Sequence, residues 1–199
     1  SRAALYRYAA FRRDLRSHEG WLILLCAPLG AAVGVAVFAV RETVYALHAF
    51  NFSLAAGSYL SAQTHIDMIR LAAVPAGLGL IFGLLAFWIR RRRSADITDP
   101  VEANALFGGR MSVPDSIRLT VATMLSNAAG ASVGMEAGYT QMGAALFSWI
   151  GQYFRLRRDD ARIFVTAGAG AAIASAFNAP LAGAFYGFEL VLGNYAPRA

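Results

Sequence analysis

Two long stretches near the start of the chain, residues 21–40 and 71–89, contain no charged residue. Each approaches the roughly 20 apolar residues that a helix needs to cross the hydrocarbon core of a bilayer. The first stretch is not typical of a signal peptide, because four further apolar segments follow it. We therefore expect two spanning helices, over residues 20–48 and 69–92.

The rest of the chain has a different pattern, in which glycine, proline and one carboxylate interrupt the uncharged segments. Residues 163–188 are uncharged but contain Pro180, where one helix is expected to end and another to begin. Residues 119–135 and 137–154 are also uncharged, are dense in Gly, Ala and Ser, and are separated by Glu136. These segments predict shorter helices that meet inside the membrane.

The polar stretch 94–116 separates these two parts. Within it, the Asp99–Pro100 pair predicts a helix start, because proline suits the first helical position and acidic residues suit a helix N-terminus. The Gly108–Gly109 pair predicts the turn between a short helix, over 100–107, and a longer helix that begins at residue 114.

The composition agrees with a membrane-embedded chain, since 57% of the 199 residues are hydrophobic and 15% are charged. A soluble domain of this size needs less apolar material for its core. Glycines recur four residues apart, a spacing that lets helix backbones approach closely in a membrane. The sequence therefore predicts an all-α membrane protein, a multi-span helical bundle with broken or re-entrant helices. The glycine pairs are Gly30–Gly34, Gly79–Gly83, Gly130–Gly134, Gly134–Gly138 and Gly183–Gly187.

Positive charge gathers at the ends of the apolar segments. The net charge is +6, and all 18 basic residues are arginines, most of them in blocks at residues 2–16, 90–93 and 155–158. A nucleic-acid binder would carry them on a soluble face with interleaved aromatic residues, so no nucleic-acid partner is expected. The positive-inside rule places the three blocks in the cytoplasm, which predicts a multi-pass protein with a cytoplasmic N-terminus. Residues 1–18 are expected to form an interfacial helix, with a solvated basic tail as the alternative.

Few residues are suited to redox or metal chemistry. The single cysteine, Cys26, lies in an apolar span, so no disulfide framework is expected. His48 and His65, with Asp67, are candidate metal ligands for a membrane enzyme, but the two histidines lack the short helical spacing of zinc sites. We expect no enzyme, no metal and no cofactor.

Glu136 is the residue that most needs an explanation. A charged group at the centre of a bilayer costs at least about 2.5 kcal/mol, so such a residue is a functional candidate by default. Because it follows Gly130 and Gly134 and precedes an apolar segment, we expect it at a helix N-terminus, where the macrodipole and free amide groups favour an anion. The same amides would hold a dissolved anion, so Glu136 would compete with it and act as a gate. A simple helix cap in a solvated loop is the alternative.

Three segments carry a family resemblance. Residues 134–138, Gly-Met-Glu-Ala-Gly, followed by Thr-Gln-Met-Gly at 140–143, are similar to the motif Gly-Arg-Glu-Gly-Pro…Val-Gln-Ile-Gly. Residues 176–183, Ala-Phe-Asn-Ala-Pro-Leu-Ala-Gly, match a second motif, and residues 154–162, Phe-Arg-Leu-Arg-Arg-Asp-Asp-Ala-Arg, follow a third. On these segments the chain resembles the CLC family of chloride channels and chloride/proton exchangers, most firmly over residues 119–190.

The resemblance implies a fold and a function. The family fold has two inverted halves and forms a dimer, and residues 1–199 resemble the first half. They are therefore expected to be the N-terminal half of a CLC-type membrane domain, with pore-forming helices over 99–193, in a homodimer that also needs the missing C-terminal half. The implied partners are chloride or a similar anion and membrane lipid. The implied function is chloride transport by a voltage-gated channel or a proton/chloride exchanger, gated by Glu136.

The resemblance also assigns further positions. The inner glutamate that carries the proton in many exchangers falls on Leu190, beside Glu189, which favours a channel slightly. The expected anion path comprises Ile97, Thr98, Pro100, Gly134, Met135, Ala137 and Gly138, and the expected structural motif comprises Phe177, Asn178 and Pro180.

The chain departs from the family pattern most clearly in the filter. The family segment Gly-Ser-Gly-Ile-Pro falls on residues 96–100, where only the proline is kept. Asp96 and Asp99 would repel an anion if they faced its path, so either the path is altered or these side chains point away from it. Two alternatives follow, a non-conducting scaffold with a degenerate filter and a member selective for fluoride or nitrate.

Overall fold

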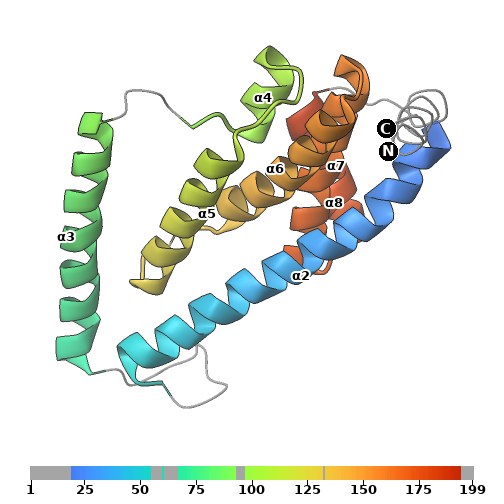
Figure 1. The fold of residues 1–199 in the computed structure, drawn as a ribbon. Helices are drawn as coiled ribbons and strands as arrows, with labels where there is room; N and C mark the ends of the chain where they lie inside the picture. Colours follow the sequence, from blue (N-terminus) through green and yellow to red (C-terminus); the bar gives the residue numbers. More distant parts are fainter. Residues whose placement is uncertain (1–18, 55–59, 61–66, 93–96, 132, 194–199) are drawn as a thin grey trace, which may run out of the picture.

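The fold is built from helices. The computed structural model describes residues 19–54, 60, 67–92, 97–131 and 133–193, and no strand occurs among them, so the predicted all-α class is confirmed. The expected interfacial helix lies outside the described residues. The elements are α2 (Glu19–Phe52), α3 (Met68–Arg92), α4 (Pro100–Leu106), α5 (Val113–Ala128), α6 (Glu136–Phe154), α7 (Arg158–Phe177), α8 (Pro180–Tyr186) and the π-helix η2 (Gly187–Leu192) (Figure 1).

Helix boundaries follow local chemistry where the sequence signals are strong. α4 begins at Pro100 as predicted, and α5 begins one residue before Pro114. Gly108 and Gly109 form the turn between them with φ angles of 61° and 78°, a conformation that favours glycine.

The predicted break before Pro180 is confirmed. α7 ends at Phe177, Asn178 adopts the left-handed conformation with φ of 51°, and α8 begins at Pro180. Asparagine tolerates this conformation at a helix end better than most residues. η2 then continues the helix to Leu192 with wider turns, which the sequence gave no reason to expect.

The core lies between α6 and α7, whose backbones touch. A Cβ atom added at Gly143 would collide with the carbonyl group of Gly168, and one added at Gly168 would collide with that of Gly143. Beside this contact, the rings of Phe147 and Phe164 pack with their centroids 4.8 Å apart. Close packing of this kind holds helices together where the hydrophobic drive of water is missing.

The predicted glycine pairs have mixed outcomes. Gly30–Gly34 on α2 and Gly183–Gly187 on α8 and η2 both face α7. Gly79–Gly83 on α3 meets no other described atom within 4 Å. The prediction of helix contacts is wrong for Gly130–Gly134 and Gly134–Gly138, because residues 130 and 134 lie in the loop between α5 and α6.

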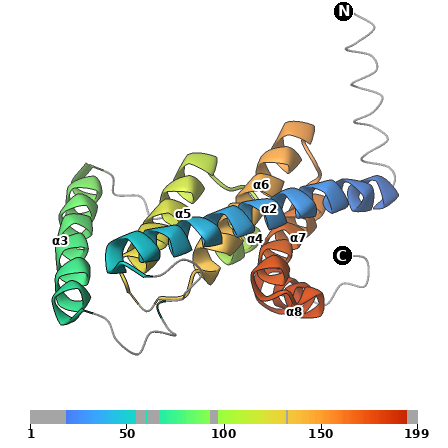
Figure 2. The ribbon, with the colours of Figure 1, turned by 90° about the horizontal axis from the view of Figure 1, so that it is seen from below.

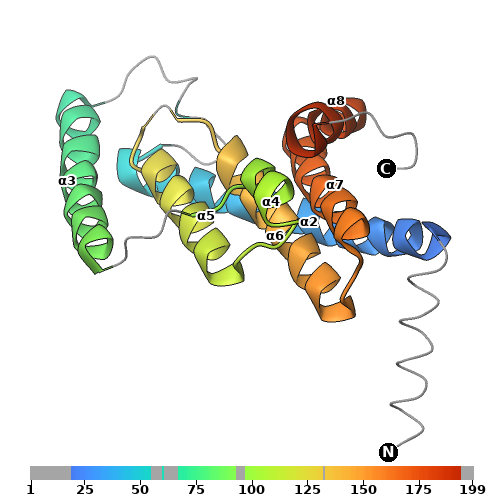
Figure 3. The same ribbon diagram turned by 90° about the horizontal axis from the view of Figure 1, so that it is seen from above.

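α3 stands apart from the other helices in Figure 1 and in the turned views of Figure 2 and Figure 3, whereas α2 runs across α5, α6 and α7 (Figure 2). Both α2 and α3 are long and apolar enough to cross a membrane. Large apolar side chains of α3 are exposed, among them Leu80, Leu84, Phe87 and Trp88. A helix that is apolar on all sides needs lipid or protein around it.

The arginine-bearing ends of two elements lie on the same side of the molecule. The C-terminal end of α3 and the junction between α6 and α7 both point toward the top of Figure 1. This agrees with the expectation that the arginine blocks at 90–93 and 155–158 share one side. That this side is cytoplasmic stays a prediction.

Candidate functional site

Glu136 lies at the helix N-terminus predicted from the sequence, as the first residue of α6. The N-cap residue, Met135, makes no side-chain hydrogen bond that would cap the helix. The amide of Tyr139 donates to the Met135 carbonyl at 2.9 Å and closes the first turn. The amides before it have no acceptor within the helix, and the helix dipole gives them a positive potential.

The Glu136 side chain folds back over the loop that precedes α6. A Cβ atom added at Gly134 would collide with the Glu136 carboxylate, so glycine at this position makes room for it. Gly134, Glu136 and Ala137 are exposed, Met135 is half-buried and Gly138 is buried. The start of α6 is therefore open on its outer side and packed on its inner side.

The loop between α5 and α6 has a fixed shape. Gly130 adopts a φ of 90°, which favours glycine, and a Cβ atom there would lie 3.0 Å from Cζ of Phe52 on α2. The Asn127 side chain donates to the Val133 carbonyl at 2.8 Å and so closes the loop on the end of α5. This geometry sets the direction from which α6 begins.

The C-terminal part of α2 supports the same loop. Nε2 of His48 lies 2.8 Å from the Asn127 carbonyl, and Nδ2 of Asn51 donates to the Ala128 carbonyl at 2.9 Å. These bonds serve carbonyl groups that the end of α5 leaves without helical partners. His48, considered above as a metal ligand, thus has a structural bond, and no group of three candidate ligands occurs among the described residues, which do not include His65.

α2 also brings a cation toward the start of α6. The Tyr139 hydroxyl lies within electrostatic range of Arg41 and Tyr45, both on α2, and also of the Glu136 carboxylate. The Arg41 guanidinium lies 5.7 Å from the Phe38 ring centroid, and its buried Nε has no hydrogen-bond partner among the described residues. Sequence reasoning missed this arginine because α2 is distant from Glu136 along the chain.

Gln141 joins α6 to the segment before α4. Its side chain is 1% exposed, and Nε2 donates at 3.0 Å both to the Thr98 carbonyl and to Oγ of Ser116. The expected path residues before α4 are thereby held beside the second turn of α6, with Ile97 half-buried and Pro100 buried. Sequence reasoning did not assign Gln141 a role, although a polar residue within an apolar segment was an available signal.

Asp99 occupies the start of α4 with its own side chain. It is the N-cap residue, and Oδ1 accepts a hydrogen bond from the Glu102 amide at 2.7 Å. The sequence left open whether this carboxylate faces an anion path or points away from it. In the structure it caps α4 itself, which makes that end a poor place for a second anion. Asp96 lies outside the described residues.

The third expected helix start, at Pro180, packs elsewhere. α8 contacts α7 and η2, beside α7 in Figure 3. Phe177 and Asn178 are exposed at the corner between α7 and α8. The hydrogen bonds that join α4, α5 and α6 do not include this corner among those that the described residues make.

The position expected for an inner glutamate lies on the π-helix. Leu190 and Glu189 are both exposed on η2. Asn104 on α4 is 1% exposed and donates through Nδ2 to the Val191 carbonyl at 3.1 Å. The buried amide of α4 thereby ties this irregular helix, a type that often occurs at functional sites, to the core.

Comparison with known proteins decides the family. A family model for the voltage gated chloride channel matches residues 77–199. The chain belongs to the CLC family. It is accordingly an integral membrane protein, in agreement with its two long apolar helices.

CLC relatives match most of the chain. The voltage-gated ClC-type chloride channel ClcB of Yersinia pseudotuberculosis is 30% identical over 175 residues, which cover 86% of this chain and 42% of that protein. The putative chloride channel protein ClcB-like of Ralstonia nicotianae is 32% identical over 180 residues, with 86% and 41% covered. A chloride/fluoride channel protein of Pseudomonas syringae pv. tomato is 46% identical over 71 residues, 36% of this chain and 16% of that protein.

The chain thus spans about two fifths of the length of the ClcB relatives it matches. No solved structure matches it.

Proposed function

We propose that this chain is the N-terminal half of a CLC-type protein that moves chloride or a similar anion across a membrane, with an anion site at the start of α6 and Glu136 as its gate. One observation carries the proposal: α6 begins without a side-chain cap, and the Glu136 carboxylate folds back over Gly134 beside its free amides. Such amides bind anions. An ionised Glu136 would occupy the site, and a protonated or displaced one would leave it open.

Several further features support this function. Arg41 adds positive charge near Tyr139 and Glu136, which favours the entry of an anion. Gln141 holds Thr98 of the expected path against α6. We include in the proposal a homodimer, a C-terminal half that completes the path, and a cytoplasmic N-terminus. With Leu190 at the inner position, we propose a channel rather than an exchanger.

The substrate is proposed from the names of relatives. ClcB of Yersinia pseudotuberculosis is named a chloride channel, which supports chloride. The relative from Pseudomonas syringae is named a chloride/fluoride channel protein, which makes fluoride the second anion to test.

A second candidate, a CLC scaffold that does not conduct, is favoured by Asp99. Its carboxylate takes the amide at the start of α4, and the family's filter residues are absent around it. If the path needs a free α4 start, this chain cannot supply one.

Efflux of chloride and of fluoride from liposomes distinguishes the two candidates. The protein is reconstituted with its C-terminal half, and cross-linking checks that the dimer is intact. We expect efflux above that of protein-free liposomes and no proton movement driven by the chloride gradient. An intact dimer without efflux of either anion contradicts transport and supports the scaffold, whereas coupled proton movement contradicts the channel.

A further inference from the structure

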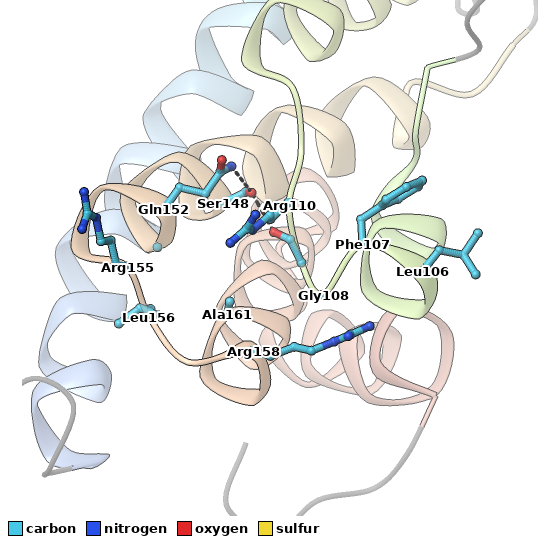
Figure 4. Close-up of a pocket in the computed structure, with 12 residues that line it drawn as sticks. Leu106, Phe107, Gly108, Arg110, Ser148, Gln152, Arg155, Leu156, Arg158 and Ala161 are labelled. Atoms are coloured by element: carbon cyan, nitrogen blue, oxygen red, sulfur yellow. Dashed lines mark hydrogen bonds between the residues drawn. The ribbon is translucent and has the colours of Figure 1, made fainter.

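A cavity of about 670 Å³ lies at the far end of α6 from Glu136. Its walls come from the turn between α4 and α5, the last turns of α6 and the start of α7 (Figure 4). The cavity is therefore separate from the proposed anion site, and it lies on the side of the molecule where α6 passes into α7.

The walls of this cavity are held in place by hydrogen bonds. Ser148 is 2% exposed, accepts a hydrogen bond from the Met111 amide at 2.9 Å and donates to the Gly109 carbonyl at 2.7 Å. Gln152 donates to Ser148 at 3.0 Å, as Figure 4 shows. On the other side, a Cβ atom added at Gly109 would lie 2.7 Å from the Ala161 carbonyl, so the turn also rests on α7. The cavity exists before any ligand arrives.

Three arginines from three elements line the cavity: Arg110 after the turn, Arg155 at the end of α6 and Arg158 at the start of α7. The Arg158 stem lies over Gly108, where a Cβ atom would come within 2.9 Å of its Cγ. All three arginines are exposed, and no carboxylate occurs among the lining residues. The concentration of like charge without a counter-charge favours an anionic ligand.

The shape of the cavity indicates the size of that ligand. In Figure 4 the side chains of Arg155 and Arg158 point to opposite sides, with Arg110 between them, so one small ion could not touch all three in this arrangement. Leu106 and Phe107, 64% and 50% exposed, form an apolar edge of the same cavity. A ligand with a phosphoryl group, a body of several atoms and an apolar part fits both features.

We propose that this cavity binds the headgroup of an anionic phospholipid, with its phosphate among Arg110, Arg155 and Arg158 and its acyl chains along Leu106 and Phe107. Basic pockets between membrane helices bind anionic headgroups in this way. An arginine fork also suits phosphate oxygens better than a single point charge does. The site goes beyond anion transport and does not depend on Glu136.

Native mass spectrometry of the purified protein tests the proposal, with phosphatidylglycerol and phosphatidylcholine supplied in equal amounts. The wild type should retain phosphatidylglycerol in preference. Removing one arginine should weaken retention about fivefold, and the triple variant R110Q/R155Q/R158Q should lose the preference altogether. Arg70→Gln removes an equal charge on α3, outside the cavity, and should leave it unchanged. If the triple variant does not fold, the three single variants decide.

Two outcomes would overturn the proposal. Equal retention of phosphatidylglycerol by the wild type and by the arginine variants would show that the lipid binds elsewhere. Displacement of the lipid by millimolar inorganic phosphate, with phosphate itself bound at the same three arginines, would show a site for a free anion instead. A preference that inorganic phosphate leaves intact and that disappears with the arginines supports the lipid headgroup.

Discussion

The starts of α4 and α6 lie close together through Gln141, and each carries a carboxylate, yet the two carboxylates behave differently. At α4, Asp99 stands in the N-cap position and accepts the Glu102 amide at 2.7 Å. At α6, Glu136 stands one position later, the N-cap is Met135, and no cap bond forms. One residue of register thus separates a carboxylate that closes a helix start from one that lies beside an open start.

This difference bears on where an anion would bind. A capped start has spent its amide on its own side chain, whereas an uncapped start keeps its positive potential for a ligand. The comparison therefore assigns the proposed anion site to α6 rather than α4. It also explains how a chain with acidic residues at its filter positions could still hold chloride, since Asp99 is occupied as a cap.

Replacing Gly134 should disturb the α6 start most. In Gly134→Ala the new Cβ atom would collide with the Glu136 carboxylate and displace it. A helix N-terminus favours a carboxylate by up to about 2 kcal/mol, so its occupancy should change by up to about thirtyfold. We expect anion efflux from liposomes to become high and insensitive to external pH. Gly79→Ala on α3, where the added atom meets nothing within 4 Å, is the control.

Removing the Gln141 side chain should separate the two helix starts. Gln141→Ala leaves the Thr98 carbonyl without its donor, at a cost of about 1–3 kcal/mol of stability. The midpoint of thermal unfolding in detergent should fall, and efflux should fall with it. Gln152→Ala, at the other end of α6, should lower stability without changing anion selectivity. Unchanged efflux in Gln141→Ala would show that the α4 segment does not belong to the path.

Opening the start of α4 should have a smaller effect on stability. Asp99→Ala removes a cap worth about 1 kcal/mol and frees the amide of Glu102. We expect a lower unfolding midpoint together with stronger chloride binding, measured by calorimetry. Asp99→Asn keeps a capping side chain and should preserve the unfolding midpoint. Weaker chloride binding in Asp99→Ala would mean that α4 contributes to the path as it stands.

The support from α2 should have the smallest effect. His48→Phe removes one hydrogen bond to the Asn127 carbonyl, worth about 0.5–1.5 kcal/mol. His48→Gln, which keeps a donor, should recover part of the loss in the unfolding midpoint. Because this bond is structural, added zinc should not stabilise the wild type, and a rise in its unfolding midpoint with zinc would revive the metal hypothesis.

The sequence predicted features that depend on neighbouring residues. Proline at position 100, asparagine before Pro180 and an isolated carboxylate after glycines each determine local backbone geometry, and the structure has a helix start or end at each place. The register of a cap is also local, but a general argument about repulsion by Asp99 hid the simpler possibility that it caps α4.

Features that depend on contacts between distant segments were not predicted. Gly143 and Gly168 look like any other membrane glycines until α6 and α7 are brought together. Arg41 and His48 reach the α6 start only because α2 crosses it. The arginines of the lipid cavity were read as a topology signal, since nothing in their spacing shows that a turn between α4 and α5 completes a cavity with them.

The most direct test of the account is the dependence of chloride efflux on external pH in Glu136→Gln, with Glu102→Gln on the first turn of α4 as the matched control. In the wild type and in Glu102→Gln, efflux should rise as the pH falls, because protonation neutralises the carboxylate that competes with the anion. Glu136→Gln should give high efflux at every pH. If Glu136→Gln keeps the pH dependence of the wild type, the carboxylate at the start of α6 is not the gate.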